Sequence, residues 1–282
     1  MRNFVKLSAV NMLVLLLAAA LIVGLFASKS AHAQQPADKA NPWQFGVSIY
    51  GYFPDITGNA AFSTDSGNDF EVDFDDILDS LQFALMGTLD VRKGSWGILT
   101  DVIYMDAGNS ASATAEGSIG NPPEPVDVTG DIKVDLQSWV WTLTGYFRAI
   151  DSKGASLDIL AGGRYLNVTQ KVDWEFTSNV GNVPFSERMG DAETSLTNWD
   201  VIFGFRGRFA LGAQKAWFIP YYLDIGTGDS DLTWQGVAGL GYAFGWGELV
   251  AAWRHLYYDM PSGMAIGDMA FSGPVAGVTF RW

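Results

Sequence analysis

The chain has 282 residues, with 17 basic against 31 acidic side chains and a formal charge of −14 at pH 7. This balance excludes a nucleic-acid-binding protein, which would need a basic surface. Cysteine is absent, which excludes disulfides and thiolate metal sites, so stability must come from burial and hydrogen bonds.

The first 33 residues are predicted to be a secretory signal peptide. Arg2 and Lys6 give it a positive start, residues 12–26 are apolar apart from one glycine, and Ala31-His32-Ala33 is a small-x-small cleavage site. The apolar run is shorter than the roughly 20 residues that a spanning helix needs. The alternative is an uncleaved membrane anchor. Cleavage would remove three bases and no acid, which would leave 14 bases, 31 acids and a formal charge of −17.

A short polar leader is expected over 34–42, and ten segments that alternate with period two follow it. Each has about the length of a tilted strand that crosses a bilayer, roughly 9–11 residues or more. The segments are 43–53, 81–92, 95–105, 132–149, 155–177, 193–211, 215–226, 231–245, 248–259 and 270–282. No segment of comparable length has the spacing of an amphipathic helix.

The connections between these segments alternate in length. Tight turns are expected at 93–94, 151–154, 212–215 and 246–247, and mostly longer outer loops at 54–80, 106–131, 178–192, 227–230 and 260–269. Short periplasmic turns and longer outer loops are typical of outer-membrane barrels. We therefore predict an all-β fold over 43–282, a closed antiparallel transmembrane up-and-down β-barrel of ten strands. Eight or twelve strands are the alternatives, because 58–74 could form its own hairpin and 155–177 could extend beyond the membrane.

Charged positions assign the faces of the strands, since a charge on the lipid face costs roughly 2–4 kcal/mol near the midplane. In 81–92 the inward set is Gln82, Ala84, Met86, Thr88, Asp90 and Arg92, and the outward set is Leu81, Phe83, Leu85, Leu89 and Val91. The same parity continues in the later strands. In the last strand Phe280 and Trp282 face outward and form the end that the insertion machinery would recognise, while Arg281 faces inward.

The expected lumen is rich in charges of both signs. The predicted ion-pair network comprises Asp90, Arg92, Asp101, Arg148, Asp158, Arg164, Asp200, Arg206, Arg208, Asp224, Glu248, Arg254 and Arg281. Buried charges must be paired, and guanidinium suits bidentate contact with carboxylates. A largely closed interior is the simplest interpretation, and a narrow channel with a charged constriction is the alternative.

Four stretches carry a family resemblance: Tyr50–Gly58 (Tyr-Gly-Tyr-Phe-Pro-Asp-Ile-Thr-Gly), Phe74–Leu81, Gly87–Gly97 and Asp101–Asp106. In them the chain resembles a broad, mostly uncharacterised proteobacterial family of exported outer-membrane β-barrel proteins of about 250 mature residues. The resemblance implies a barrel and an outer-membrane location, and it implies no activity and no catalytic residue. The chain departs from these barrels in ending on Trp, where Phe is more common.

Two features suggest chemistry beyond a plain barrel. His255 is the single histidine after the signal peptide, but its parity places it on the lipid side, away from any shielded nucleophile. In the first outer loop Asp69, Glu71, Asp73 and Asp75 would share one face of an extended segment. Such oxygen clusters suit Ca²⁺ or Mg²⁺, although a solvated face that prevents edge pairing explains them as well.

The sequence therefore predicts a non-enzymatic outer-membrane barrel with a structural or surface role. A porin-like passive channel is the alternative, and an outer-membrane enzyme is the third possibility. We expect a monomer without a cofactor, apart from the divalent cation considered for the first loop. Its expected partners are outer-membrane lipid, lipopolysaccharide and, during insertion, the barrel-assembly machinery.

Overall fold

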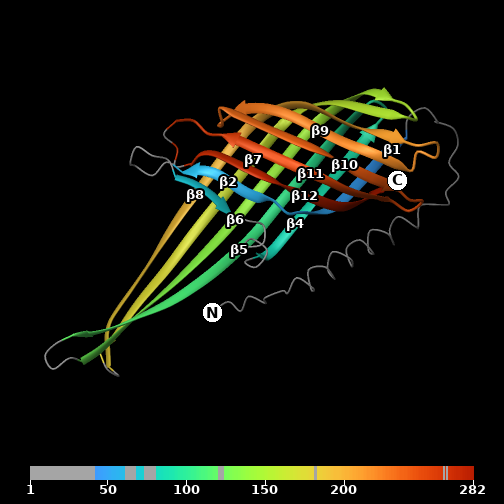
Figure 1. Ribbon diagram of the computed structural model, residues 1–282. Helices are drawn as coiled ribbons and strands as arrows, with labels where there is room; N and C mark the ends of the chain where they lie inside the picture. The colour runs from blue at the N-terminus through green and yellow to red at the C-terminus, as the bar shows by residue number, and fades with distance from the viewer. Residues whose placement is uncertain are drawn as a thin grey trace.

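A computed structural model of the chain describes residues 42–60, 68–72, 81–119, 124–180, 183–262, 264 and 266–282. Within these ranges no helix is long and apolar enough to cross a membrane. The regular structure in them is antiparallel strand, which the ribbon in Figure 1 shows wrapped into a barrel with a long extension. The predicted signal peptide and nearly all of the predicted leader lie outside the described residues.

The described residues form twelve strands. These are β1 (Trp43–Tyr52), β2 (Asp55–Ala60), β3 (Asn68–Val72), β4 (Leu81–Lys93), β5 (Trp96–Ile119), β6 (Glu124–Asp151), β7 (Ala155–Val180), β8 (Val183–Leu211), β9 (Trp217–Gly228), β10 (Leu232–Ala243), β11 (Glu248–Asp259) and β12 (Ile266–Arg281).

Ten of these strands close a ring, so the predicted closed ten-stranded barrel is confirmed. The order runs from β1 through β4 to β12, each strand antiparallel to the next. Closure comes from β1 and β12, which pair from Gly46↔Arg281 to Tyr52↔Val275. Closing the ring gives both strands a second partner and leaves no open edge along this stretch.

The hairpin considered for 58–74 exists, but it adds no strands to the ring. Pro54 interrupts the first strand after Tyr52, and proline cannot donate to a ladder. β2 then continues along β12, with Ser272 opposite Asp55, and β3 pairs only with β2. The hairpin therefore extends the line of β1 and adds one extra strand, β3, beside the barrel.

The two ends of the barrel differ. At one end, which we call the turn end, short connections join β4 to β5, β6 to β7, β8 to β9 and β10 to β11. β12 ends there at Arg281, followed by Trp282, whose backbone exchanges hydrogen bonds with Phe45. Gly94 and Gly212 adopt positive φ angles of 62° and 72° in two of these turns. Glycine suits such angles because it has no Cβ.

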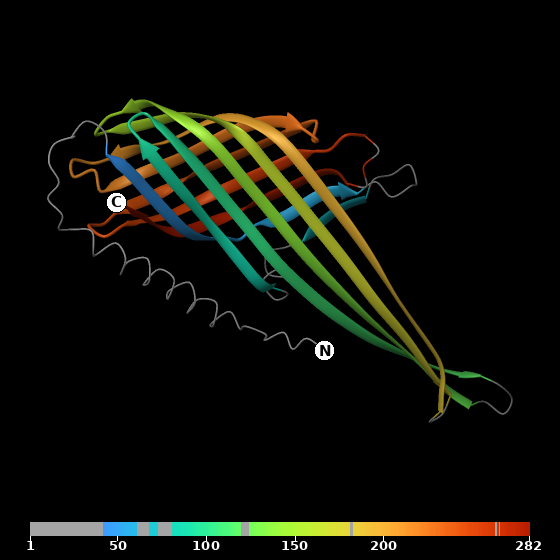
Figure 2. The same cartoon turned by 180° about the vertical axis from the view of Figure 1, so that it is seen from behind.

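At the other end β5 to β8 run far past the ring, and both views show them as one tapering sheet (Figures 1 and 2). This sheet, which we call the blade, comprises 108–119, 124–135, 171–180 and 183–193, joined through Gly108↔Asp135, Asp135↔Lys171 and Lys171↔Glu193. The 29 residues of β8 span about 95 Å at about 3.3 Å per residue. The expectation of long loops over 106–131 and 178–192 was therefore wrong, because where these ranges are described they continue the ladders of the barrel.

The outer face of the ring carries the apolar residues that parity predicted. Trp96, Ile98, Leu85, Leu89, Trp199, Val201, Phe203, Phe205, Trp217, Leu223, Ile225 and Trp253 are among its exposed large side chains. In water this belt would be a large exposed apolar patch, of the kind that marks a lipid or protein contact. At the edge of the belt Trp282 is exposed and its ring lies stacked 6.1 Å from Phe45.

One face assignment was wrong. Leu81 was expected to face lipid, but it packs against the apolar cluster inside the barrel. The pairing with β5 shifts by one residue between Leu81 and Phe83, which lie opposite Ala107 and Asp106. A bulge of this kind reverses the parity of the residues beyond it.

Candidate functional site

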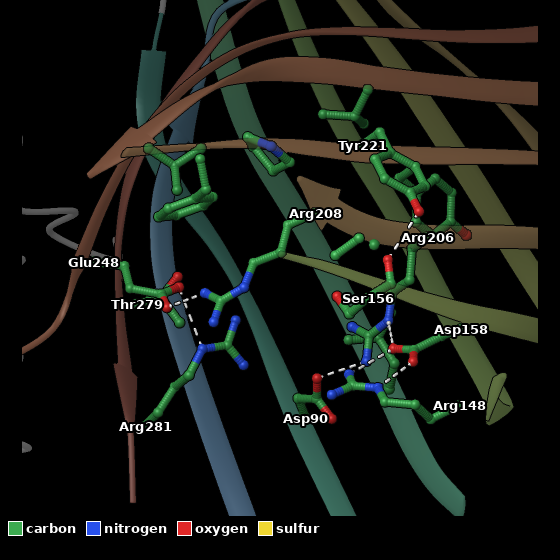
Figure 3. Close-up of a pocket in the computed structure, with 18 of the residues that line it drawn as sticks. Asp90, Arg148, Ser156, Asp158, Arg206, Arg208, Tyr221, Glu248, Thr279 and Arg281 are labelled. Carbon is green, nitrogen blue, oxygen red and sulfur yellow. Dashed lines mark hydrogen bonds and ion pairs between the residues drawn. The ribbon is translucent and has the colours of Figure 1, made fainter. Parts of the chain in front are cut away.

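The ring encloses a cavity of about 590 Å³ at the turn end, which we call the mouth cavity (Figure 3). Side chains from all ten ring strands line it, together with residues of two turns. The lining contains six arginines and two lysines against five carboxylates. It therefore has a formal excess of three positive charges, inside a chain whose own formal charge is −14.

One wall of the mouth cavity holds a balanced cluster of four charges. Arg148 donates to both carboxylate oxygens of Asp158, at 2.5 and 3.0 Å, and Arg206 Nε lies 3.2 Å from Asp158 Oδ2. Arg206 Nη2 also donates to Asp90 Oδ2 at 2.6 Å. Two guanidinium groups meet two carboxylates here, so the cluster has no net charge.

A tyrosine and a glycine hold this cluster in place. Tyr146 Oη donates to Asp90 Oδ1 at 2.6 Å, and the guanidinium of Arg206 lies over the Tyr146 ring at 4.4 Å. The ring lies across Gly97, where a Cβ would fall 2.3 Å from the ring carbon Cζ. Glycine at position 97 therefore provides the space that Tyr146 occupies.

The opposite wall is not balanced, as Figure 3 shows. Arg208 Nη1 donates to Glu248 Oε1 at 2.6 Å, and Arg281 Nε donates to Glu248 Oε2 at 3.2 Å. Two arginines thus share one carboxylate. Their side chains keep 45% and 52% of their surface exposed, whereas Glu248 keeps 10%. The guanidinium of Arg208 also lies 5.2 Å from the centre of the Phe218 ring.

The rim is formed by residues near the ends of β1, β4 and β6 and by residues of two turns. Arg92 donates to the side-chain oxygen of Gln44 and, at 3.1 Å, to Asp151 Oδ2. Lys153 and Lys215 come from two turns. The predicted network did not include Asp151. This residue ends β6 and forms an ion pair with Arg92 of β4.

The floor of the mouth cavity is a buried group centred on Arg254. Its Nη2 donates to Asp101 Oδ2 at 2.9 Å and to Gln235 Oε1 at 2.6 Å, and its Nη1 donates to Tyr50 Oη at 3.1 Å. Tyr50 Oη in turn donates to Asp101 Oδ1 at 2.6 Å. Every member therefore has a partner in a dry setting, as a buried charge requires.

A second buried pair, Arg164 with Asp224, is also dry. Both side chains are 0% exposed, and Arg164 Nη2 donates to Asp224 Oδ2. Thr142 and Thr233 accept from its other nitrogens at 3.3 Å. Asp224 Oδ1 is buried without a hydrogen-bond partner among the described residues. Asp224 therefore contacts Arg164 through Oδ2 alone.

The interior toward the blade is apolar. A cluster of inward-facing side chains fills it: Tyr52, Ile56, Met86, Ile103, Met105, Val140, Leu166, Leu256, Tyr258, Met260, Met269 and Phe271. Leu166, Leu256 and Tyr258 have 0–1% of their surface exposed. Sequence reasoning missed this layer, although Met, Ile and Leu at inward parity in the predicted strands were a signal for it.

The structure brings twelve of the thirteen predicted network residues into ion pairs. Asp200 is the exception, since no arginine contacts it among the described residues. Its Oδ1 instead accepts from Ser230, from the backbone nitrogen at 3.1 Å and from Oγ at 2.8 Å, and its Oδ2 accepts from Asn198 at 2.5 Å. Three hydrogen bonds thus satisfy this buried carboxylate without a cation.

The other predicted features fall outside the lumen or outside the described side chains. His255 lies on the outer face against Trp234, with 4.7 Å between the ring centres. In the candidate divalent site Asp69 and Glu71 are described only as backbone in β3, and Asp73 and Asp75 lie outside the described residues. Among the described residues no group of three or more His, Cys, Asp or Glu side chains is placed to hold a metal ion.

Comparison with solved structures gives outer-membrane proteins. The chain is similar to Ail, the attachment invasion locus protein of Yersinia pestis, with 11% identity, a TM-score of 0.32, and 85% of this chain and 98% of that one covered. It is similar to the outer-membrane protease OmpT of Escherichia coli, with 9% identity, a TM-score of 0.36 and coverage of 88% and 99%. It is also similar to the translocator domain of the autotransporter NalP of Neisseria meningitidis, with 13% identity, a TM-score of 0.31, and 95% of this chain and 97% of that one covered.

Identities this low, with TM-scores below 0.5, support no inference about what this chain binds or does. No protein-family model and no curated protein matches the sequence. The resemblance to the proteobacterial family therefore still depends on the four stretches quoted above, and it stays a prediction.

Proposed function

We propose that this protein is a non-enzymatic outer-membrane barrel whose sealed interior anchors the blade at the cell surface. The observation that carries the proposal is the continuity of β5 to β8, which run from the turn end through the ring into the blade. In this proposal the membrane anchor and the displayed sheet are formed by the same four continuous strands.

The apolar belt supports the membrane part of the proposal. An apolar outer belt with aromatic side chains near its edges suits contact with lipid, and lipopolysaccharide would cover the outer leaflet. The short turns and the end of β12 lie at the same end of the barrel. Because outer-membrane barrels have short periplasmic turns, this end would face the periplasm. The blade then projects outward.

The interior supports an anchor better than a pore. From the floor upward, Arg254, Arg164 and the apolar cluster leave inward-facing side chains such as Leu166 and Tyr258 with almost no exposed surface. A conducting pore needs a continuous water path, and the burial of these side chains supports a lumen without one.

The blade has two different faces, which suits a binding surface. On one face Ile132, Val134, Val172, Trp174 and Phe176 continue the inward parity of the barrel, and Ile132 and Phe176 are exposed. A single-layer sheet with an uncovered apolar face is a candidate for contact with a partner.

The other face of the blade is strongly charged. The blade contains ten acidic and three basic residues, a formal charge of −7. Like charges stand directly opposite in Asp131↔Glu175 and Asp173↔Asp191, an arrangement that is destabilising without a counter-charge. Lys171 pairs with Asp173 at 3.3 Å, and this hydrogen bond raises the pKa of Lys171. We therefore expect a partner of this face to be cationic.

Surface display can be tested by labelling, because the chain has no cysteine of its own. Met189, 71% exposed in the blade, and Lys153, exposed in a turn, are matched positions for single substitutions to cysteine. In a Gram-negative host, Met189→Cys should react with a membrane-impermeant maleimide on intact cells. Lys153→Cys should react only after the outer membrane is permeabilised. The reverse pattern would overturn the proposed orientation.

A passive channel is the second candidate, favoured by the mouth cavity, which has a volume of about 590 Å³ and a charged lining at the turn end. Bilayer recording of the refolded protein separates the two functions. A sealed anchor should give no steady conductance steps, and conductance steps of tens of picosiemens or more would refute the sealed anchor. His255→Ala tests the enzyme alternative, which a loss of lipid- or peptide-cleaving activity would revive.

A further inference from the structure

The charges of the mouth cavity are unevenly distributed, and this has a chemical consequence. The wall cluster of Asp90, Arg148, Asp158 and Arg206 is neutral, and the floor pairs Arg254 with Asp101. Arg92 is paired with Asp151 at the rim. The excess of positive charge therefore collects where Arg208 and Arg281 share Glu248, with Lys153 and Lys215 at the cavity edge.

The geometry leaves donors free at this place. Glu248 accepts from one nitrogen of each arginine, and among the described residues no other hydrogen-bond acceptor contacts Arg208 or Arg281 through its side chain. A guanidinium carries five N–H donors. Several donors on each arginine thus face the cavity, and Figure 3 shows the two side chains converging on Glu248 from different strands.

Each arginine also has contacts that orient it in the absence of a ligand. Phe218 supports Arg208 from one side, while Arg281 comes from the last ring strand beside Gly46, where a Cβ would lie 3.4 Å from Arg281 Nη1. Positioned guanidinium groups bind carboxylate and phosphate oxygens in a bidentate manner and lose little freedom on binding.

We propose that the mouth cavity binds a small multivalent oxyanion from the turn side, held between Arg208 and Arg281. Its volume of about 590 Å³ falls within the range of small-molecule sites, roughly 300–1,000 Å³. Glu248 is the internal competitor, because it accepts a hydrogen bond from both arginines and neutralises one of their two charges. The site requires no passage through the barrel, so it stands whether the lumen is sealed or open.

Calorimetric titration of the refolded, detergent-solubilised protein with pyrophosphate tests this site. A parallel titration with citrate distinguishes a phosphate ligand from a carboxylate one. Tight binding of pyrophosphate alone indicates a phosphate ligand, and equal or tighter binding of citrate indicates a carboxylate one. Arg208→Gln and Arg281→Gln should each weaken binding roughly tenfold or more, the loss of a charge-assisted hydrogen bond pair. Arg188→Gln, in the blade, is the matched control and should leave the affinity unchanged.

Glu248→Gln supplies a test in the opposite direction, because it removes the internal competitor and should tighten binding. A structural role alone would predict weaker binding, since the two arginines would lose their common partner. Absence of binding by the wild-type protein, an equal loss in Arg188→Gln, or weaker binding in a folded Glu248→Gln variant would each overturn the proposal. Heat-dependent gel mobility verifies that each variant is folded.

Discussion

The arginines of the barrel interior form two regions that use the same side chain differently. Arg164 and Arg254, in the middle of the barrel, are nearly or fully buried and contact several acceptors each. Arg208 and Arg281, at the mouth, are about half exposed and share one carboxylate. The two regions therefore differ in burial and in the number of acceptors that each arginine contacts, and only the second has the exposure that the proposed ligand site requires.

The physical reason is the cost of desolvation. A buried guanidinium that loses its partner remains an uncompensated charge in a poorly polarisable interior, whereas water can replace the partner of an exposed one. Substitutions in the two regions should therefore differ strongly in their effect on stability.

Arg164→Met should be the most damaging single change, because it leaves Asp224 buried and unpaired. We expect a loss of about 3–5 kcal/mol in the free energy of unfolding. Urea titration followed by tryptophan fluorescence measures it. Adding Asp224→Leu should recover most of the loss, and a double variant as unstable as the single one would show that the damage comes from packing instead.

Phe203→Lys tests the outer face. Phe203 is 60% exposed within the apolar belt, so in a bilayer the substitution should cost about 2–4 kcal/mol. Met189→Lys, at a comparably exposed blade position, should change stability by less than about 0.5 kcal/mol. Reversible unfolding from lipid vesicles gives both values, and equal costs would mean that lipid does not cover Phe203.

Tyr146→Phe should cost about 1.5 kcal/mol or somewhat more, since Asp90 loses a hydrogen bond from an almost fully buried hydroxyl. Tyr221→Phe is a useful control, because its hydroxyl donates to the backbone oxygen of Ser156 from a more exposed site. A smaller loss there is expected in the same urea titration.

Arg208→Gln should have the smallest effect on folding, below about 1 kcal/mol, because Arg208 is half exposed and Glu248 keeps Arg281. Its anion affinity should nevertheless fall. A stability loss as large as that of Arg164→Met would remove the distinction between the two regions.

Much of the barrel could be predicted from the sequence, because alternation and charge parity are local signals. Asp200, Arg206 and Arg208 mark the inner face of β8 without any knowledge of their partners. The strand count followed from ten such segments and their turns.

Other features depend on relations between distant strands, which one sequence does not display. The bulge at Leu81 depends on how β4 and β5 align. The blade was mistaken for loops because Ser110 to Ala115 alternate only between Ser or Thr and Ala, which are too small to give the apolar face expected of a membrane strand. The partners of Asp200 and the unequal charge of the mouth cavity depend on which inward side chains meet across the lumen.

The unbroken ladder between β5 and β6 has a mechanical consequence. It runs without a register shift from Trp96↔Phe147 near the turn end to Ile119↔Glu124 at the tip of the blade. Its hydrogen bonds lie across the strand direction. A pull on the tip along the strands would therefore load many of these bonds together in shear, with no hinge to absorb the force. Tension applied at the tip would be transmitted directly to the ring.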